Sequence, residues 1–117
     1  MKKSDRIIIQ KIIGYCNDVS SLLERFNTSY ELYLTDIAFQ YACNMCIIQI
    51  GELTNRLSVE LKVETSEIPW HAIRAMRNLH AHDYERVDFE MMWETLTQDI
   101  PFLKTQLTAL LTKSANG

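Results

Sequence analysis

The residues best suited to chemistry are concentrated in one segment near the middle of the chain, from Trp70 to Tyr84. Its first thirteen residues contain two arginines, all three histidines of the protein and no carboxylate. The whole chain has a formal net charge of -3, so this local excess of cationic groups needs an explanation. Guanidinium groups bind phosphate through paired N–H donors, and imidazole transfers protons near neutral pH. The segment therefore indicates a site that binds a phosphodiester and could cleave it.

Arg77 and His82 are the two residues that such a cleavage needs most. Without a metal, RNA cleavage requires a base for the 2′-hydroxyl proton, an acid for the leaving oxygen and a cation near the phosphorus. His82 can act as base or acid, and Arg77 can stabilise the developing negative charge. Five positions apart on a helix, they point about 140° away from each other. A two-fold dimer in which each protomer contributes to a shared cleft would bring such groups onto one phosphate.

The same two residues also have a structural interpretation. Arg77 could be an ordinary surface arginine, and His82 could lie at the C-terminus of a helix, where a positive charge is favoured by the helix dipole. Asn78 could orient a phosphate or a water molecule, or could form a hydrogen bond between helices. Tyr84 follows Arg77 by seven residues and could line the same cleft or pack the loop. His71, Arg74 and His80 would widen the cationic rim and contact RNA.

Neither the histidines nor the cysteines form a convincing metal or redox motif. His80, His82 and Asp83 supply two imidazoles and one carboxylate with no further ligand cluster, so we expect no metal and no cofactor. Cys43 and Cys46 have the spacing of a redox motif, but they lie within an apolar helical pattern rather than beside a strand. We interpret them as packing residues.

Length and composition predict one small globular domain. The 117 residues are 47% hydrophobic, and we assign residues 1–113 to the domain and 114–117 to a flexible C-terminal tail. A sequence pI near 5.6 argues against a broad nucleic-acid surface, so RNA contact would be local or built by two subunits. No export signal and no apolar stretch of about 20 residues is evident, so we expect no membrane association. Three cysteines, an odd number, are best explained as free thiols in the cytoplasm.

The apolar spacing predicts an all-α, up-and-down four-helix bundle. The predicted helices span residues 5–26, 36–61, 69–82 and 88–110, joined by a turn at 27–29, a polar connection at 62–68 and a loop at 83–87. Pro69 suits the first turn of a helix, Asp88 suits a cap, and Pro101 should kink the last helix. The middle of the second helix, from Tyr41 to Ile50, is apolar nearly all round. This pattern predicts a dimer, or alternatively a helix enclosed by its own bundle.

The chemical segment also resembles a known family signature. Arg77, four residues, His82, one residue and Tyr84 is similar to the signature of HepT-like toxins in the HEPN superfamily. The resemblance covers about residues 36–107, and the first helix is similar in character only. Elsewhere it rests on five further groups of residues: Ile48-x-x-Gly51-Glu52 with Arg56-Leu57-Ser58, Glu67-Ile68-Pro69-Trp70, Met76-Arg77-Asn78, Val87-Asp88 with Trp93, and Asp99-Ile100-Pro101. Ala81 and Asp83 differ from the family, which commonly has a hydrophobic residue before the histidine and glycine after it.

The resemblance implies a homodimeric, metal-independent endoribonuclease whose catalytic Arg77 and His82 line a cleft between protomers, with Asn78 as a helper. It implies a toxin of the type VII HepT/MntA toxin–antitoxin systems. Its partner would be an MntA-like minimal nucleotidyltransferase that transfers AMP to Tyr84. An AMP group would add negative charge and bulk beside the cationic cleft. The alternative is a non-catalytic HEPN module that binds nucleotides or serves as the recognition partner of such a nucleotidyltransferase.

Overall fold

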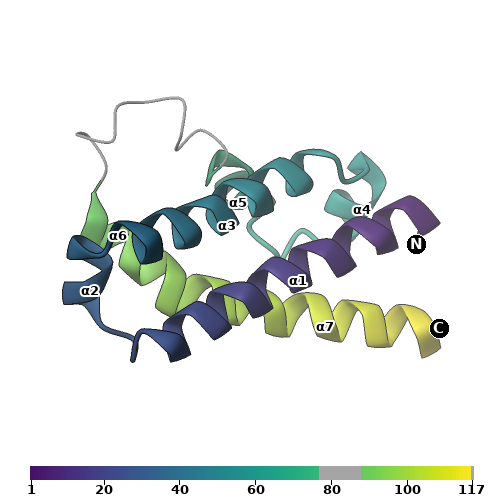
Figure 1. Ribbon diagram of the computed structural model, residues 1–117. Helices are drawn as coiled ribbons and strands as arrows, with labels where there is room; N and C mark the ends of the chain where they lie inside the picture. Colours follow the sequence, from purple (N-terminus) through teal and green to yellow (C-terminus); the bar gives the residue numbers. More distant parts are fainter. Residues whose placement is uncertain (77–87, 117) are drawn as a thin grey trace.

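Three long helices form the frame of the molecule in the computed structural model, which describes residues 1–76 and 88–116. They are α1 (Lys3–Arg25), α3 (Ile37–Asn55) and α7 (Ile100–Asn116). Helix α1 packs against both others, runs antiparallel to them, and leaves the two termini at the same end (Figure 1). The described residues contain no strand, which confirms the predicted all-α class. The shorter elements are α2 (Tyr30–Thr35), α4 (Val59–Glu64), α5 (Trp70–Ala75), α6 (Phe89–Glu94) and the π-helix η3 (Thr95–Asp99).

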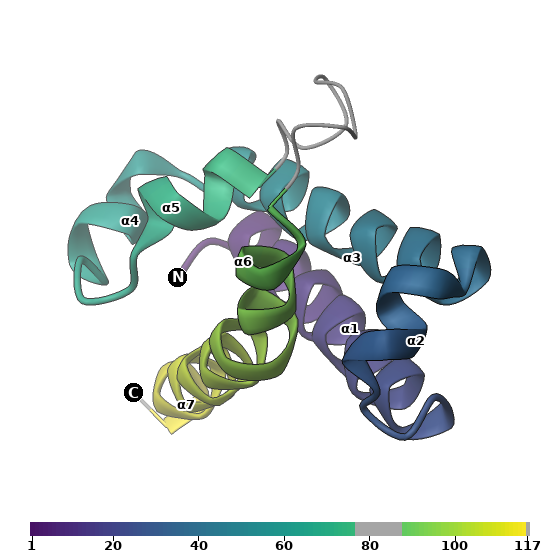
Figure 2. The same cartoon turned by 90° about the vertical axis from the view of Figure 1, so that its left-hand side faces the viewer.

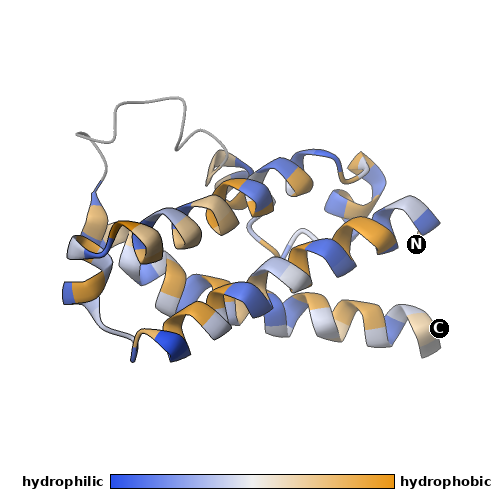
Figure 3. Cartoon of the chain, in the orientation of Figure 1, coloured by the Kyte–Doolittle hydropathy of each residue, from blue (hydrophilic) through white to orange (hydrophobic). Residues whose placement is uncertain are grey.

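Helix α1 shows how the apolar spacing produces the core. Ile9, Ile12, Cys16 and Val19, spaced by three or four residues, are buried between α3 and α7. Apolar and polar residues therefore alternate along each long helix (Figure 3). The helix ends in a turn where Asn27 and Thr28 have positive φ angles of 56° and 48°. The predicted first helix and the turn that follows it are confirmed.

The predicted second helix, 36–61, is wrong at its C-terminal end, because the structure divides it into α3 and α4. Ser58 begins the new helix: its Oγ accepts a hydrogen bond from the Leu61 N–H at 3.2 Å. The buried carboxylate of Asp5 on α1 accepts bonds from the Ser58 N–H at 2.9 Å and from the Ser58 hydroxyl at 2.5 Å. A contact between residues 53 positions apart thus fixes the break. Residues 62–64, predicted as a connection, belong to α4.

Replacing Asp5 with alanine should therefore destabilise the fold. The change removes both acceptors of Ser58 and loosens the junction of α1 with α4, and we expect the free energy of unfolding to fall by about 1–3 kcal/mol. Urea denaturation followed by circular dichroism measures this loss. Asp18→Ala is the matched control, because Asp18 is an exposed carboxylate on the same helix. Equal unfolding midpoints for the two variants would show that the Asp5–Ser58 contact contributes nothing.

Helix α3 is covered on only part of its circumference. Nine of its residues are buried, including Cys43, Ile47 and Ile50. Ile37 is 65% exposed, and Tyr41 and Met45 are each 55% exposed, at intervals of four residues. These three side chains lie along one side of the helix. Within residues 1–76 and 88–116, α3 thus presents three apolar side chains that its own chain leaves exposed. This favours the predicted dimer, and the alternative of a helix enclosed by its own bundle stays a prediction.

The three cysteines belong to the interior. Cys16, Cys43 and Cys46 are free and buried. Burial raises the pKa of Cys43 to about 12 and those of Cys16 and Cys46 to about 11. At neutral pH these thiols are protonated and poorly nucleophilic, so the packing interpretation of Cys43 and Cys46 is confirmed.

The C-terminal helical run begins as predicted and then departs from an α-helix. Asp88 caps α6, its Oδ1 accepting from the Met91 N–H at 3.1 Å. The π-helical turn η3 follows and ends two residues before Pro101. Proline has no N–H and crowds the preceding turn, and a π-turn is a usual way to relieve that conflict. Helix α7 continues through Asn116, so it includes residues 114–116 that we assigned to the tail.

Candidate phosphodiester-binding site

The residues of the predicted site fall into two groups in the structure. Five of them lie outside the described residues: Arg77, Asn78, His80, His82 and Tyr84. Their predicted roles and their mutual arrangement remain predictions. His71 and Arg74 lie on α5, where His71 is exposed and Arg74 is half-buried.

Helix α5, which precedes the signature in sequence, is packed tightly against the rest of the fold. Trp70 is only 6% exposed, and its indole Nε1 donates to the Thr65 hydroxyl at 2.9 Å. Ile73 is buried one turn later, and α5 packs against α3. Seen from the end where α2 lies, α4 and α5 stand beside α3 while α1 runs below it (Figure 2). Met76, the residue before Arg77, therefore closes a helix that the core fixes in place.

The element that follows the signature is anchored by aromatic packing. Phe89, the first residue of α6, meets the ring of Tyr33 edge-on with centroids 5.9 Å apart. Tyr33 is fully buried and donates its hydroxyl proton to Asn44 Oδ1 on α3 at 2.6 Å. Trp93 joins the same cluster, with centroids 5.4 Å from Tyr33 and 6.2 Å from Phe39. Helix α3 thus supports the elements on both sides of the signature.

A cation that the sequence did not single out lies beside Arg74. Burial lowers the pKa of the Lys62 ammonium, the positive charge of Arg74 lowers it further, and Asp5 opposes both effects. Lys62 on α4 and Arg74 on α5 are therefore close enough to repel each other. His71, which is exposed on the same helix as Arg74, is a further basic side chain of α5. Sequence spacing could not reveal the pair of Lys62 and Arg74, because it depends on how α4 and α5 are placed in space.

The described part of the chain contains neither a cluster of metal-binding side chains nor a helix that could span a membrane. Within residues 1–76 and 88–116, no three His, Cys, Asp or Glu side chains gather closely enough to hold a metal ion. The His80, His82 and Asp83 set lies outside those residues. Over the same ranges, none of the helices has the length and apolarity needed to cross a bilayer.

Comparison with known proteins finds similarity to one family over nearly the whole chain. A family model described as "Ribonuclease HepT-like" matches residues 7–110, so the similarity includes the first helix. "Probable ribonuclease HepT" of Thermococcus cleftensis is 30% identical over 112 residues, 94% of this chain and 98% of that protein. A protein named "Putative RNase" from Caldanaerobacter subterraneus subsp. tengcongensis is 30% identical over 112 residues, 95% of this chain and 97% of the relative.

A further relative matches this chain at lower identity. A "Putative RNase" of Methanocaldococcus jannaschii is 26% identical over 110 residues, 94% of this chain and 89% of that protein. No solved structure matches the chain at a comparable level of significance. All three relatives are close to this chain in length, so the similarity covers whole domains.

Proposed function

The chain belongs to the HepT-like ribonuclease family, and from that membership we propose that it is an endoribonuclease toxin that cleaves RNA with Arg77 and His82. The observation that carries the proposal is the match over residues 7–110, within which the sequence reads arginine, four residues, histidine, one residue, tyrosine. The packing of α5 and the mutual repulsion of Lys62 and Arg74 support an anionic substrate near α4 and α5.

The proposed reaction is an internal transesterification of RNA. One His82 imidazole takes the proton of the 2′-hydroxyl, the 2′-oxygen forms a bond to phosphorus, and the bond from phosphorus to the 5′-oxygen breaks. A protonated imidazole supplies a proton to the leaving 5′-oxygen. Arg77 stabilises the extra negative charge on the phosphorane, with Asn78 as a second donor. The products are a 2′,3′-cyclic phosphate and a 5′-hydroxyl, and no step requires a metal.

Cleavage in the presence of a chelator tests this proposal. We expect the purified protein to cut RNA in excess EDTA and to leave 2′,3′-cyclic phosphate ends, which resist a 3′-ligase until they are opened. Expression of the toxin in the cytoplasm without its antitoxin should stop cell growth. Intact RNA together with normal growth would instead favour the non-catalytic module that recognises nucleotides or substrates for a partner enzyme.

A homodimer is part of the proposal, and the exposed side of α3 supports it. Ile37, Tyr41 and Met45 form an apolar strip at intervals of four residues, and Leu34 on α2 is 43% exposed beside its start in sequence. Apolar side chains gathered along one side of a helix are typical of an interface between subunits. A two-fold axis beside this strip would pair each strip with its own copy.

Placing two carboxylates on this strip should dissociate the dimer. We expect Ile37→Glu/Met45→Glu to weaken dimerisation on the order of 100-fold or more, because like charges would face each other across the two-fold axis. Analytical ultracentrifugation measures the change. The control is Val59→Glu/Val63→Glu, which adds the same charge to two exposed valines of α4. If both variants remain dimeric, the strip is not the interface.

The proposed antitoxin is an MntA-like minimal nucleotidyltransferase that attaches AMP to Tyr84. After co-expression with such an enzyme encoded next to this chain, we expect peptide mass spectrometry to find AMP on Tyr84. The Tyr84→Phe variant should be unmodified and should stay toxic in the presence of the enzyme. Tyr33 offers an internal check, because its side chain is fully buried and already bonded to Asn44. Modification of Tyr30, Tyr33 or Tyr41 in place of Tyr84 would refute the assignment.

A further inference from the structure

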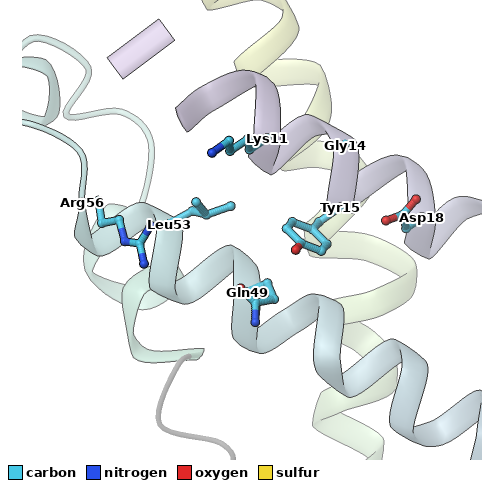
Figure 4. A pocket seen from close by; sticks show the side chains of 7 residues that line it. All are labelled: Lys11, Gly14, Tyr15, Asp18, Gln49, Leu53 and Arg56. Carbon is cyan, nitrogen blue, oxygen red and sulfur yellow. The ribbon is translucent and has the colours of Figure 1, made fainter. Parts of the chain in front are cut away.

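A groove of about 540 Å³ lies between α1 and α3. Lys11, Gly14, Tyr15 and Asp18 line it from α1, and Gln49, Leu53 and Arg56 line it from α3 (Figure 4). Lys11 and Arg56 lie toward one end of the groove, on opposite walls, with the Tyr15 ring between the helices and Gln49 below it. A second hollow shares Tyr15 and Asp18 and continues the groove toward Met45.

Gly14 forms part of the groove wall and is not required by internal packing. It lies in the middle of α1, where glycine costs about 0.5–1 kcal/mol of helix stability relative to alanine. A Cβ added at this position would meet nothing within 4 Å. Its φ is not positive, so the backbone conformation does not demand glycine either. The missing side chain therefore leaves an open wall at which an external group can approach the helix backbone.

The charges of the groove favour an anion. Lys11 and Arg56 are both exposed, and the ion pair found among the described residues, Lys2 with Glu60, involves neither of them. Asp18 is the carboxylate among the lining residues and lies at the other end. The Tyr15 hydroxyl and the Gln49 amide add neutral hydrogen-bond donors between this cationic end and Asp18. Leu53 is buried and forms an apolar floor.

This combination of groups matches single-stranded RNA. Grooves that bind single strands combine cations, which follow the phosphates, with an aromatic ring on which a base stacks. Lys11 and Arg56 supply the cations, and the half-buried Tyr15 supplies a ring at the junction of the two hollows. We propose that the α1–α3 groove binds the sugar–phosphate backbone of RNA outside the cleavage site, with Tyr15 stacking on a base. The inference rests on the proposed function for its substrate, but it adds a second contact surface for that substrate.

The proposal is tested by RNA binding in EDTA with the His82→Ala protein, so that no cleavage interferes. Fluorescence anisotropy of a labelled single-stranded RNA is measured as a function of salt. We expect Lys11→Gln/Arg56→Gln to weaken binding about tenfold and to reduce the salt slope by about 1.4, since each phosphate contact on a single strand contributes about 0.7. Lys3→Gln/Lys113→Gln removes the same charge from exposed positions outside the groove and should leave binding unchanged.

Three further variants separate the effects of groove shape and base stacking from the effect of charge. Gly14→Leu should close the groove without breaking the helix, and we expect it to weaken RNA binding about tenfold. Tyr15→Ala should weaken binding by a similar factor, while Tyr15→Phe keeps the ring and should bind like the parent. Circular dichroism melting of each variant confirms that it is folded. RNA affinities equal to that of the parent in the Lys11/Arg56 and Gly14 variants would overturn the proposal.

The outcomes also separate this inference from the proposed function. Cleavage of a dinucleotide, whose single phosphodiester cannot occupy the cleavage site and the groove at once, should be unaffected by the groove variants. If the parent protein cleaves no RNA but the groove variants still lose affinity, the proposed function fails and the groove assignment stands. If the groove variants keep their RNA affinity and lose only binding to the nucleotidyltransferase, the groove assignment fails. It also fails if ATP displaces RNA from the groove at equal phosphate concentration.

Discussion

The variant His82→Ala is expected to cleave RNA about 100 to 10,000 times more slowly than the parent protein, which is the usual contribution of general acid–base catalysis. Alanine cannot accept the 2′-hydroxyl proton or supply one to the 5′-oxygen, whereas the fold and the binding cations remain. The measurement is the initial rate of cleavage of a short fluorescent RNA in EDTA. In cells, the same change should abolish the growth arrest that the parent causes.

His71→Ala is the matched control for this experiment. His71 is an exposed histidine on the surface of α5, eleven positions earlier, and is predicted to lie on the rim of the site rather than at the reacting phosphate. Its loss should leave the maximal rate within a fewfold of the parent and act mainly on RNA affinity. Equal rates for His82→Ala and the parent would remove histidine from the mechanism and end the case for this ribonuclease.

The helical frame was accessible from the sequence because its signals are local. The apolar spacing of Ile12, Cys16 and Val19 specifies a buried face, and Asp88 caps the helix that it precedes. The break between α3 and α4 was missed because it depends on Asp5, which is 53 positions from Ser58 in sequence. A contact of this kind exists only after α1 and α4 have come together, and no periodicity along either helix records it.

The site shows the same division between local and long-range information. The signature of Arg77, His82 and Tyr84 is contiguous in sequence, so it could be found there. Lys62 was missed because its proximity to Arg74 results from the placement of α4 beside α5. The α1–α3 groove was missed for a similar reason, since Lys11 and Arg56 come from helices that are far apart in sequence. Gly14 was the one sequence signal for it, an interior helix glycine with no turn to form.

Mixing two inactive variants should restore activity if the cleavage site is shared between protomers. Arg77→Ala alone is expected to lose about 100- to 1,000-fold in rate, because a charge-stabilising donor is missing. In a heterodimer of Arg77→Ala with His82→Ala, the shared cleft keeps Arg77 from one chain and His82 from the other. With random exchange of subunits, half of the dimers are mixed and each keeps one arginine and one histidine in its cleft, so the mixture should cleave RNA well above the rate of either variant alone.

This result follows from helix geometry as well as from the family resemblance. If Arg77 and His82 lie on one continuous helix, a spacing of five residues directs them about 140° apart, so a single protomer does not aim both at the same phosphate. The control adds Ile37→Glu/Met45→Glu to both chains, which should keep the chains monomeric and leave the mixture inactive. A mixture of the two original variants that stays as slow as its components would mean that each chain carries a complete site, and the requirement for a dimer in catalysis would be lost.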